Sequence, residues 1–267
     1  MNPYFSIIIP TYNSEKHIEF CIRSLIIQTF NDFEVIFIDN NSEDKTISII
    51  EQYKSKLPKV ILKSEKDKGI YFAMNKGIKL ATGKWLYFLG SDDYLYNENV
   101  LQKIYNYTSI ENIEVIYGNV LSKLWEGKYI GEVNEKNIYN TNICHQAIFY
   151  RNSIFKKFGL YNTKYIIHAD WEFNFRWMCS PFVNKKYVEE IIANFGASGT
   201  CTILKDDLFA LEKYYLYTKH SFFYRFSNVY ICLKHYLKNK EIILTFKTVL
   251  LFPKFIVLCF FKYQSHE

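Results

Sequence analysis

The sequence is poor in the two residues that most often interrupt regular structure. Its 267 residues include only 10 glycines and 5 prolines, which excludes a collagen-like chain and a Pro/Gly-rich disordered one. The six cysteines form no CxxC pair and no close group with histidine. They are Cys21, Cys144, Cys179, Cys201, Cys232 and Cys259. This scattered spacing predicts reduced thiols in a cytosolic protein rather than a zinc site or a disulfide framework.

Long hydrophobic runs are also missing. The first apolar run covers only Phe5 to Ile9 before Pro10 ends it, and no basic leader precedes it. Near the C-terminus the longest uncharged stretch, Phe255 to Phe261, is far shorter than the roughly 20 apolar residues that span a bilayer. We therefore expect a cytoplasmic protein without a signal peptide or a transmembrane helix.

Two common nucleotide-binding motifs are absent, since the chain contains neither GxGxxG nor GxxxxGK[ST]. What is present is a chain with 49% hydrophobic residues, of which 23 are Tyr and 23 are Phe, so a full core can form. Because both motifs are absent, a bound nucleotide would need other partners for its phosphates.

Short apolar runs alternate with helical patterns over the first 120 residues. The runs cover residues 5–9, 33–39, 59–63 and 85–89. Helical patterns are expected at about 14–28, after Ser42 and at 69–82, with Ser14 and Ser42 as N-caps. Strands that alternate with helices at this spacing predict an α/β fold with a mostly parallel sheet covered by helices on both faces.

Polar clusters follow three of these strands. They are PTYN at 10–13, DNNS at 39–42 and GSDD at 90–93. Because ligands bind at the carboxyl ends of parallel strands, these clusters predict a nucleotide-sized site. The neighbouring carboxylates of Asp92 and Asp93 repel each other unless a positive charge lies beside them, which favours a divalent cation.

The chain resembles family 2 glycosyltransferases, in particular the bacterial subgroup that builds cell-surface polysaccharides such as O-antigen repeats. The likeness covers roughly residues 4 to 200. It is carried by residues 6–46 (SIIIPTYN…DKT), 66–95 (KDKGIYF…SDDYL), 117–120 (YGNV) and 143–176 (ICHQAIFY…DWEFNFR). It implies a Rossmann-like GT-A domain at 1–204, with a nucleotide-sugar half at about 1–120 and an acceptor half at about 121–204. A helical tail at 205–267 would follow.

The resemblance assigns roles around the donor. It makes Asp93 the ligand of Mn²⁺ or Mg²⁺ and gives Asp92 the ribose or a metal-bound water; the alternative is that Asp93 caps the following helix. It makes Asp39 the acceptor for the imide N–H of uracil, with an ordinary turn as the alternative. Lys76 is a weaker phosphate candidate. The other expected donor contacts are Pro10, Thr11, Asn13, Asp67, Lys68, Gly69 and Asn75.

On the acceptor side the resemblance makes Asp170 the catalytic base. An inverting transferase needs a carboxylate that removes the proton of the acceptor hydroxyl as its oxygen attacks the anomeric carbon. Glu172 is the competing acid, and Asp170 alternatively caps a helix at 171–179.

Four further residues are candidates close to this base. His145, Gln146 and Trp171 are expected to contact the acceptor, with structural roles as the alternatives. His168 is a candidate third metal contact.

The tail carries the basic charge of the chain. Between Lys213 and Lys262 there are nine Lys or Arg and only one acid, Glu241, which gives this segment +8 while the whole chain is +6. Lys240, Lys247 and Lys254 recur every seven residues and share one helical face. Such a face among aromatic and aliphatic residues predicts a helix in the membrane interface, rather than a nucleic-acid site. A solvated basic hairpin and a dimer surface are the alternatives.

Together these features predict an inverting, metal-dependent glycosyltransferase. It would move a sugar from a UDP-sugar to a hydroxyl of an undecaprenyl-diphosphate-linked oligosaccharide, and would lie peripherally on the inner face of the cell membrane. One alternative is a polyprenyl-phosphate glycosyltransferase, which needs no base. Another is a non-catalytic, nucleotide-sugar-binding membrane scaffold. A hydrolase, with water as the acceptor, is a further one.

Overall fold

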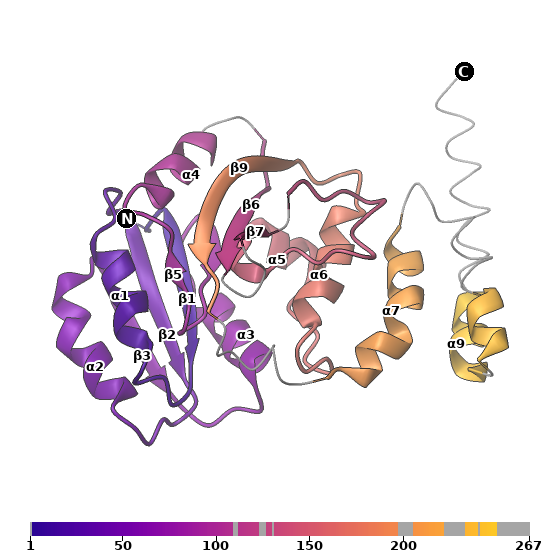
Figure 1. The fold of residues 1–267 in the computed structure, drawn as a ribbon, viewed down its shortest axis with the longest axis horizontal. Coiled ribbons are helices and arrows are strands. Elements are labelled where there is room, and N and C mark those ends of the chain that lie inside the picture. The colour runs from indigo at the N-terminus through magenta and orange to yellow at the C-terminus, as the bar shows by residue number, and fades with distance from the viewer. Residues whose placement is uncertain are drawn as a thin grey trace.

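Parallel strands form the N-terminal half of the fold. A computed structural model describes residues 2–108, 112–122, 127–129, 131–196, 205–221, 233–239 and 241–249. The first four strands are β1 (Phe5–Thr11), β2 (Phe33–Asp39), β3 (Val60–Ser64) and β4 (Trp85–Phe88). They lie in the order β3-β2-β1-β4 and all pair in parallel, as the apolar runs predict (Figure 1). The strand order reverses between β1 and β4, which creates a crevice at their carboxyl ends.

Beyond β4 the sheet becomes mixed. The later strands are β5 (Tyr94–Leu95), β6 (Val115–Ser122), β7 (Gly127–Tyr129), β8 (Ile148–Arg151) and β9 (Lys185–Asn194). Strand β8 runs antiparallel to both β4 and β6, and β9 runs parallel to β6. Strands β5 and β7 pair antiparallel to β9 and β6. The described residues thus form one nine-stranded sheet that joins the two halves.

Helices cover this sheet and extend past its end. They are α1 (Ile18–Ile26), α2 (Thr46–Tyr53), α3 (Ile70–Leu80), α4 (Val100–Thr108), α5 (Ser153–Phe158), α6 (Ala169–Met178), α7 (Asp207–His220) and α9 (Ile242–Val249), with single turns η1 (Lys54–Lys56) and η3 (His145–Ala147). Helix α1 packs on α2, whereas α3 packs on β1 and β2. Right-handed crossovers place α3 on the face opposite α1 and α2. Helix α7 packs on α6, and α7 and α9 lie on the far side of α6 from α1 (Figure 1).

The two predicted serine caps are wrong. Helix α1 begins at Ile18 with His17 as its N-cap, because the Ser14 hydroxyl instead hydrogen-bonds Ser91 Oγ at 2.8 Å. Helix α2 begins at Thr46, since Ser42 donates its hydroxyl to Asp39 and the Asp44 carboxylate accepts from the Thr46 N–H. Both serines bond to groups across the sheet edge rather than to the helix that follows them.

Two capping alternatives also fail. Asp93 caps no helix, because α4 begins only at Val100. Helix α6 begins at Ala169 after the N-cap His168, so Asp170 lies inside its first turn.

Aromatic side chains fill the core between the sheet and α6. Tyr87 of β4 stacks on Phe149 of β8 with ring centroids 4.2 Å apart, and Phe155 of α5 stacks on Phe173 of α6 at 4.9 Å. All four side chains are buried. Tyr150 of β8 also meets Phe173 edge to face at 5.8 Å, and because aromatic pairs add to the burial of apolar area, these contacts hold α5 and α6 against the sheet.

Part of the basic tail lies within the described residues. Lys247 is exposed on α9, while Lys240 and Lys254 lie outside the described residues. Among the helices that the structure describes, none is both long enough and apolar enough to cross a membrane. Of the six cysteines, Cys21, Cys144 and Cys179 are described, and all three are free thiols.

Candidate functional site

A cleft of about 840 Å³ opens at the crevice between β1 and β4. Nine of the residues expected at the site line it. They are Pro10, Thr11, Asn13, Asp67, Gly69, Asp92, Asp93, His145 and Gln146. The cleft therefore collects side chains from both halves of the sheet, as expected for a ligand at a topological switch point.

Asp93 is a buried carboxylate at the floor of this cleft. Its Oδ2 accepts from the Gly90 N–H at 3.1 Å and from Gln146 Nε2 at 3.0 Å, and its Oδ1 accepts from the Gly196 N–H at 2.7 Å. Burial, followed by the neighbouring charge of Asp92, raises the pKa of Asp93 to about 7. The raised pKa means that the negative charge is incompletely compensated within the chain.

Two glycines shape the space around the aspartates. A Cβ at Gly90 would lie 2.5 Å from Asp93 Oδ2, and one at Gly196 would lie 2.5 Å from the carbonyl oxygen of Asp92. Any larger residue would displace a carboxylate. The Gly196 contact was not predicted, because this residue lies 103 positions from Asp93 in the sequence.

Asp39 holds the ends of three strands together. Its Oδ1 accepts from Thr11 Oγ1 at 3.2 Å and Ser42 Oγ at 2.5 Å, and its Oδ2 accepts from the Ser42 N–H at 2.9 Å and Ser64 Oγ at 2.7 Å. Asp39 is fully buried and is not among the residues that line the cleft. An imide contact to Asp39 would require Ser42 or Ser64 to release it.

The segment before and within α3 contributes Asp67 and Gly69 to the cleft. Asp67 Oδ1 accepts from the Gly69 N–H at 2.9 Å, while its buried Oδ2 has no hydrogen-bond partner among the described residues and lies 3.9 Å from Lys76 Nζ. Gly69 has φ +135°, a backbone conformation that favours glycine, and its missing side chain leaves the cleft open. An unsatisfied buried carboxylate oxygen beside open space suits a donor group on a ligand.

Asn75 and Lys68 do not reach the cleft. Asn75 Nδ2 donates to the carbonyl of Tyr161 at 2.9 Å, and its Oδ1 accepts from the Tyr161 N–H at 3.0 Å. Both ends of this amide thus tie α3 to the loop before α6, and Asn75 is not among the residues that line the cleft. Lys68 is exposed and does not line the cleft.

His145 and Asp170 lie beside each other, one lining the cleft and the other behind it. His145 Nδ1 lies 3.5 Å from Asp170 Oδ2, and each side chain is 8% exposed. His145 lines the cleft at the start of η3, whereas Asp170 lies behind it in the first turn of α6. The Asp170 Oδ1 atom accepts from the Trp171 N–H at 2.7 Å.

Sequence comparison identifies the family of this chain. Residues 6–191 match the family described as Glycosyl transferase family 2. The chain belongs to glycosyltransferase family 2. A relative in Mycobacterium bovis, a PGL/p-HBAD biosynthesis glycosyltransferase, is 37% identical over 200 residues, which cover 74% of this chain and 78% of that protein. A shorter match is 35% identical over 119 residues, 43% of this chain and 19% of a poly(ribitol-phosphate) beta-glucosyltransferase of Bacillus spizizenii.

Solved structures match the fold of this family 2 glycosyltransferase. S. aureus TarS in complex with UDP-GlcNAc is similar with a TM-score of 0.67 at 20% identity, covering 85% of this chain and 69% of that chain. A mannosyltransferase from Pyrobaculum calidifontis in complex with GDP-Man and Mn²⁺ is similar with a TM-score of 0.61 at 16% identity, covering 82% and 63%. The GT-A fold expected from the sequence is therefore confirmed.

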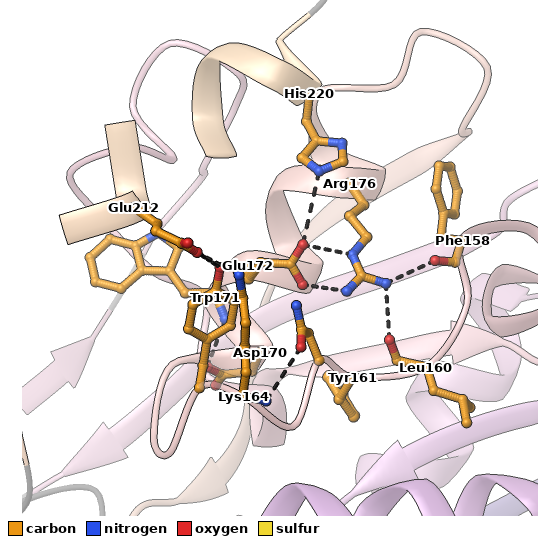
Figure 2. Close-up of polar contacts among 12 residues, drawn as sticks. Phe158, Leu160, Tyr161, Lys164, Asp170, Trp171, Glu172, Arg176, Glu212 and His220 are labelled. Carbon is orange, nitrogen blue, oxygen red and sulfur yellow. Dashed lines mark hydrogen bonds and ion pairs between the residues drawn. The ribbon is translucent and has the colours of Figure 1, made fainter. Parts of the chain in front are cut away.

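Glu172 is a structural residue in this glycosyltransferase. Figure 2 shows its carboxylate against Arg176, which forms hydrogen bonds to both Glu172 oxygens and to the carbonyls of Phe158 and Leu160. His220, at the end of α7, lies 3.9 Å from the same carboxylate. Glu172 is buried and does not line the cleft, so it joins α6 to α7 instead of competing for the acceptor.

Trp171 and His168 belong to an aromatic cluster outside the cleft. The ammonium of Lys213 lies 3.7 Å from the centre of the Trp171 ring, and Trp171 Nε1 donates to the Ile138 carbonyl. His168 stacks on Phe209, with Nδ1 4.0 Å from an oxygen of Asp206. His168 therefore packs against Phe209 and Asp206 and does not line the cleft, and a sugar would meet an occupied Trp171 face.

Several residues that line the cleft were not among the individual site residues expected from the sequence. They are Tyr12, Ser14, Glu15, Lys16, His17, Asn40, Glu43, Asp44, Ile70, Ala73, Gly90, Ser91, Phe195 and Gly196. Most lie in the loops after β1, β2 and β4, where Asp44 Oδ2 accepts from the Glu15 N–H and Asn13 Oδ1 accepts from the Glu43 N–H. The predicted polar clusters lie at the starts of these loops. Which further loop residues line the cleft depends on the hydrogen bonds between the two loops.

The site fits a divalent cation whose coordination shell is completed by oxygen atoms of a substrate. Among the described residues, no cluster of three or more His, Cys, Asp or Glu side chains is arranged to hold a metal by itself. Asp93 nevertheless places a carboxylate of incompletely compensated charge in the cleft with the carboxylate of Asp92 beside it, and oxygen is the ligand that Mg²⁺ and Mn²⁺ prefer. Two protein carboxylates suit a metal whose remaining ligands are water and phosphate oxygens.

Proposed function

We propose that this enzyme transfers a sugar, with inversion, from a UDP-sugar to an acceptor hydroxyl in a reaction that requires Mn²⁺ or Mg²⁺. The observation that carries the proposal is that one cleft brings a buried carboxyl close to a histidine–carboxylate pair. Asp93 lines the cleft with a pKa of about 7, and His145, which lines the same cleft, lies beside Asp170. Charge neutralisation and proton removal are the two requirements of such a transfer.

The donor end would hold the nucleotide through polar groups that already face the cleft. Asp93, with Asp92 beside it, would hold the metal, which when bound offsets the charge that grows on the leaving diphosphate. Pro10, Thr11 and Asn13 would wall the base and ribose. The Oδ2 of Asp67, which accepts no hydrogen bond from the described residues, would accept one from the base or ribose, and this would leave Asp39 in its structural role.

The acceptor end would activate the hydroxyl at the Asp170 site. The acceptor oxygen would attack the anomeric carbon opposite the leaving diphosphate, and its proton would pass to the protein as the bond forms. Gln146 would support this geometry, because its amide nitrogen is held by Asp93 while its buried Oε1 has no partner among the described residues. A single displacement of this kind inverts the anomeric configuration.

The acceptor would be a glycan on a lipid diphosphate in the synthesis of a bacterial surface polysaccharide. Names of the relatives support this class, since one acts in PGL/p-HBAD biosynthesis and another on poly(ribitol-phosphate). The basic, aromatic tail would hold the enzyme on the inner face of the cell membrane, where such a lipid is embedded.

Isothermal titration calorimetry with UDP tests the donor site. Wild-type protein should bind UDP only in the presence of Mn²⁺, and Asp93→Ala should bind at least tenfold more weakly. Asp32→Ala is the matched control, because Asp32 is an exposed aspartate directly before β2, at the opposite edge of the sheet. GDP serves as the competing nucleotide.

Binding of UDP that is independent of metal, or equal in Asp93→Ala, would contradict the role of Asp93. Tighter binding of GDP would contradict the UDP-sugar donor and keep the rest of the site.

A further inference from the structure

The cleft exposes a histidine where a carboxylate base was expected. Asp170 is 5% exposed, and it is not among the residues that line the cleft. Its Oδ1 is engaged by the Trp171 N–H. The remaining oxygen, Oδ2, faces His145 Nδ1 at 3.5 Å. A hydroxyl that enters the cleft therefore meets the imidazole before it meets the carboxylate.

His145 is held in place from two sides. It opens the single turn η3, whose next residue, Gln146, is bonded to Asp93 through its side chain and to Tyr87 through its carbonyl. Asp170 lies on its Nδ1 side. This environment fixes the ring with one nitrogen toward a buried carboxylate, which is the arrangement that orients an imidazole for proton transfer.

We propose that Asp170 acts through His145, so that His145 Nε2 receives the proton of the acceptor and Asp170 is the positioning residue. This inference rests on the proposed transferase function and refines its acceptor end. Asp170 accepts the Nδ1–H of the neutral imidazole and thereby keeps the Nε2 lone pair available on the cleft side.

The bonds and charges of the step balance. As the acceptor oxygen forms its bond to the anomeric carbon, the hydroxyl proton moves to His145 Nε2. The bond between the anomeric carbon and the phosphate oxygen breaks, and its electron pair remains on the leaving nucleoside diphosphate. The imidazolium that forms is paired with the Asp170 carboxylate until it releases its proton to solvent.

A second observation separates this pair from a purely structural one. Tyr150 and Tyr161 lie close enough for the Asp170 charge to add to the effect of burial on their pKa values, which both rise. Asp170 thus has the phenols of Tyr150 and Tyr161 on the core side and the imidazole of His145 on the cleft side. An ion pair used only for stability gains nothing from placing its histidine on the surface of a ligand cleft.

Kinetics of four variants test the proposal. UDP release is measured for wild type with UDP-glucose, UDP-galactose and UDP-GlcNAc, with water as the acceptor, and the variants are then compared on the donor turned over fastest. His145→Asn keeps an amide near the Nδ1 position, and His145→Gln places one near the Nε2 position. Both should lower kcat at least a hundredfold, as should Asp170→Asn.

The double variant His145→Asn with Asp170→Asn should lose no more than the worse single variant, because the two groups act as one unit. The affinity for UDP with Mn²⁺ should stay within threefold of wild type in all four, which a general loss of structure would not allow. His235→Gln, an exposed histidine on the helix at 233–238, is the matched control with unchanged kcat.

Activity of His145→Asn within threefold of wild type, together with an inactive Asp170→Asn, would overturn the proposal and make Asp170 the direct base. Loss of UDP affinity in His145→Asn would also overturn it and place His145 at the donor. Failure of UDP binding in wild type itself would instead count against the proposed function.

Imidazole ¹⁵N NMR gives a readout that needs no turnover. Neutral His145 should be protonated at Nδ1 and unprotonated at Nε2. The fraction of this tautomer should be lower in Asp170→Asn than in wild type. A protonated Nε2 in wild type, or no response to Asp170→Asn, would contradict the proposed orientation.

Discussion

Two buried aspartates at the edge of the sheet are bound in different ways. Asp39 receives four hydrogen bonds, three of them from side-chain hydroxyls, and joins the ends of β1, β2 and β3. Asp93 receives three, two of them from backbone N–H groups, and has the carboxylate of Asp92 beside it. Asp39 is thereby a structural clamp, whereas Asp93 keeps a charge that a cation would stabilise.

The raised pKa of Asp93 predicts a pH-dependent stability of the metal-free protein. The carboxyl ionises near 3.8 in the unfolded chain and at about 7 in the folded one, so the folded state binds more protons between these values. Stability of the metal-free protein should therefore fall as pH rises from about 4 to 7 and stay low above it. Thermal unfolding in EDTA across this range measures the effect.

Asp93→Asn provides the comparison for this prediction, because the variant has no proton to lose at this position. The stability of the variant should depend less on pH over the same range. Added Mn²⁺ with UDP should raise the Tm of wild type but not that of Asp93→Asn. Parallel pH profiles of wild type and variant would show that another group sets the slope.

At the scale of elements, helix α6 carries two acidic residues with different roles. Asp170 in its first turn faces His145, and His145 lines the cleft. Glu172, two residues later, points away and binds Arg176, which in turn holds the carbonyls of Phe158 and Leu160 (Figure 2). The neighbouring acids of the DWE segment are thus divided between chemistry and the docking of α6 on its surroundings.

Glu172→Gln should destabilise the protein while leaving UDP affinity unchanged. The Arg176 side chain is only 14% exposed, so loss of its partner leaves a buried charge, which typically costs about 3–5 kcal/mol. Urea unfolding gives the free-energy change, and calorimetry with UDP and Mn²⁺ gives the affinity.

Glu172→Leu combined with Arg176→Met should lose less stability than Glu172→Gln alone, because no charge is then left unpaired. A fully stable Glu172→Gln protein would mean that water reaches Arg176.

At the scale of the whole molecule, the net positive charge and the candidate site lie in different parts of the chain. The sheet and its cleft lie within residues 5–196, and the basic segment begins at Lys213. Helix α7 connects the two, since Glu212 binds Lys164 and Tyr165 in the loop before α6. This arrangement allows the tail to bind a surface while the cleft stays open to a substrate.

Charge reversal in the tail should weaken membrane binding. Three Lys→Glu substitutions, at Lys240, Lys247 and Lys254, remove attractions of about 1 kcal/mol each to an anionic surface and add repulsion. Binding of the full chain to vesicles of 30% phosphatidylglycerol in phosphatidylcholine should fall at least about a hundredfold. Co-sedimentation measures it, with UDP binding as the test of an intact fold.

The matched control replaces three exposed lysines outside the tail by glutamate: Lys54, Lys56 and Lys79. Lys16 is not used, because it lines the cleft. Equal loss in both triple variants would mean that net charge rather than the tail drives the association. Undiminished binding of the tail variant would contradict the basic helical face as the membrane contact.

The sequence by itself determined the four parallel strands β1 to β4 and the position of the cleft. Runs such as 5–9 and 33–39 are apolar at every residue or nearly so, and only strands buried on both faces of a sheet require that. Polar residues at the ends of such strands necessarily meet at one edge. Of the expected site residues, Asp93 lies in the loop after β4 and His145 lies in the single turn before β8, and both line the cleft.

Only the tertiary structure decided which polar side chains remain available to a ligand. Asn75 is spent on Tyr161, 86 residues away, and Ser14 on Ser91, 77 residues away. Gly196 approaches Asp93 across 103 residues. Hydrogen bonds between such distant positions depend on how the helices and loops pack, and no local pattern encodes them. Local sequence therefore places a polar group at the edge of the sheet, and long-range packing decides whether that group binds the protein or faces the cleft.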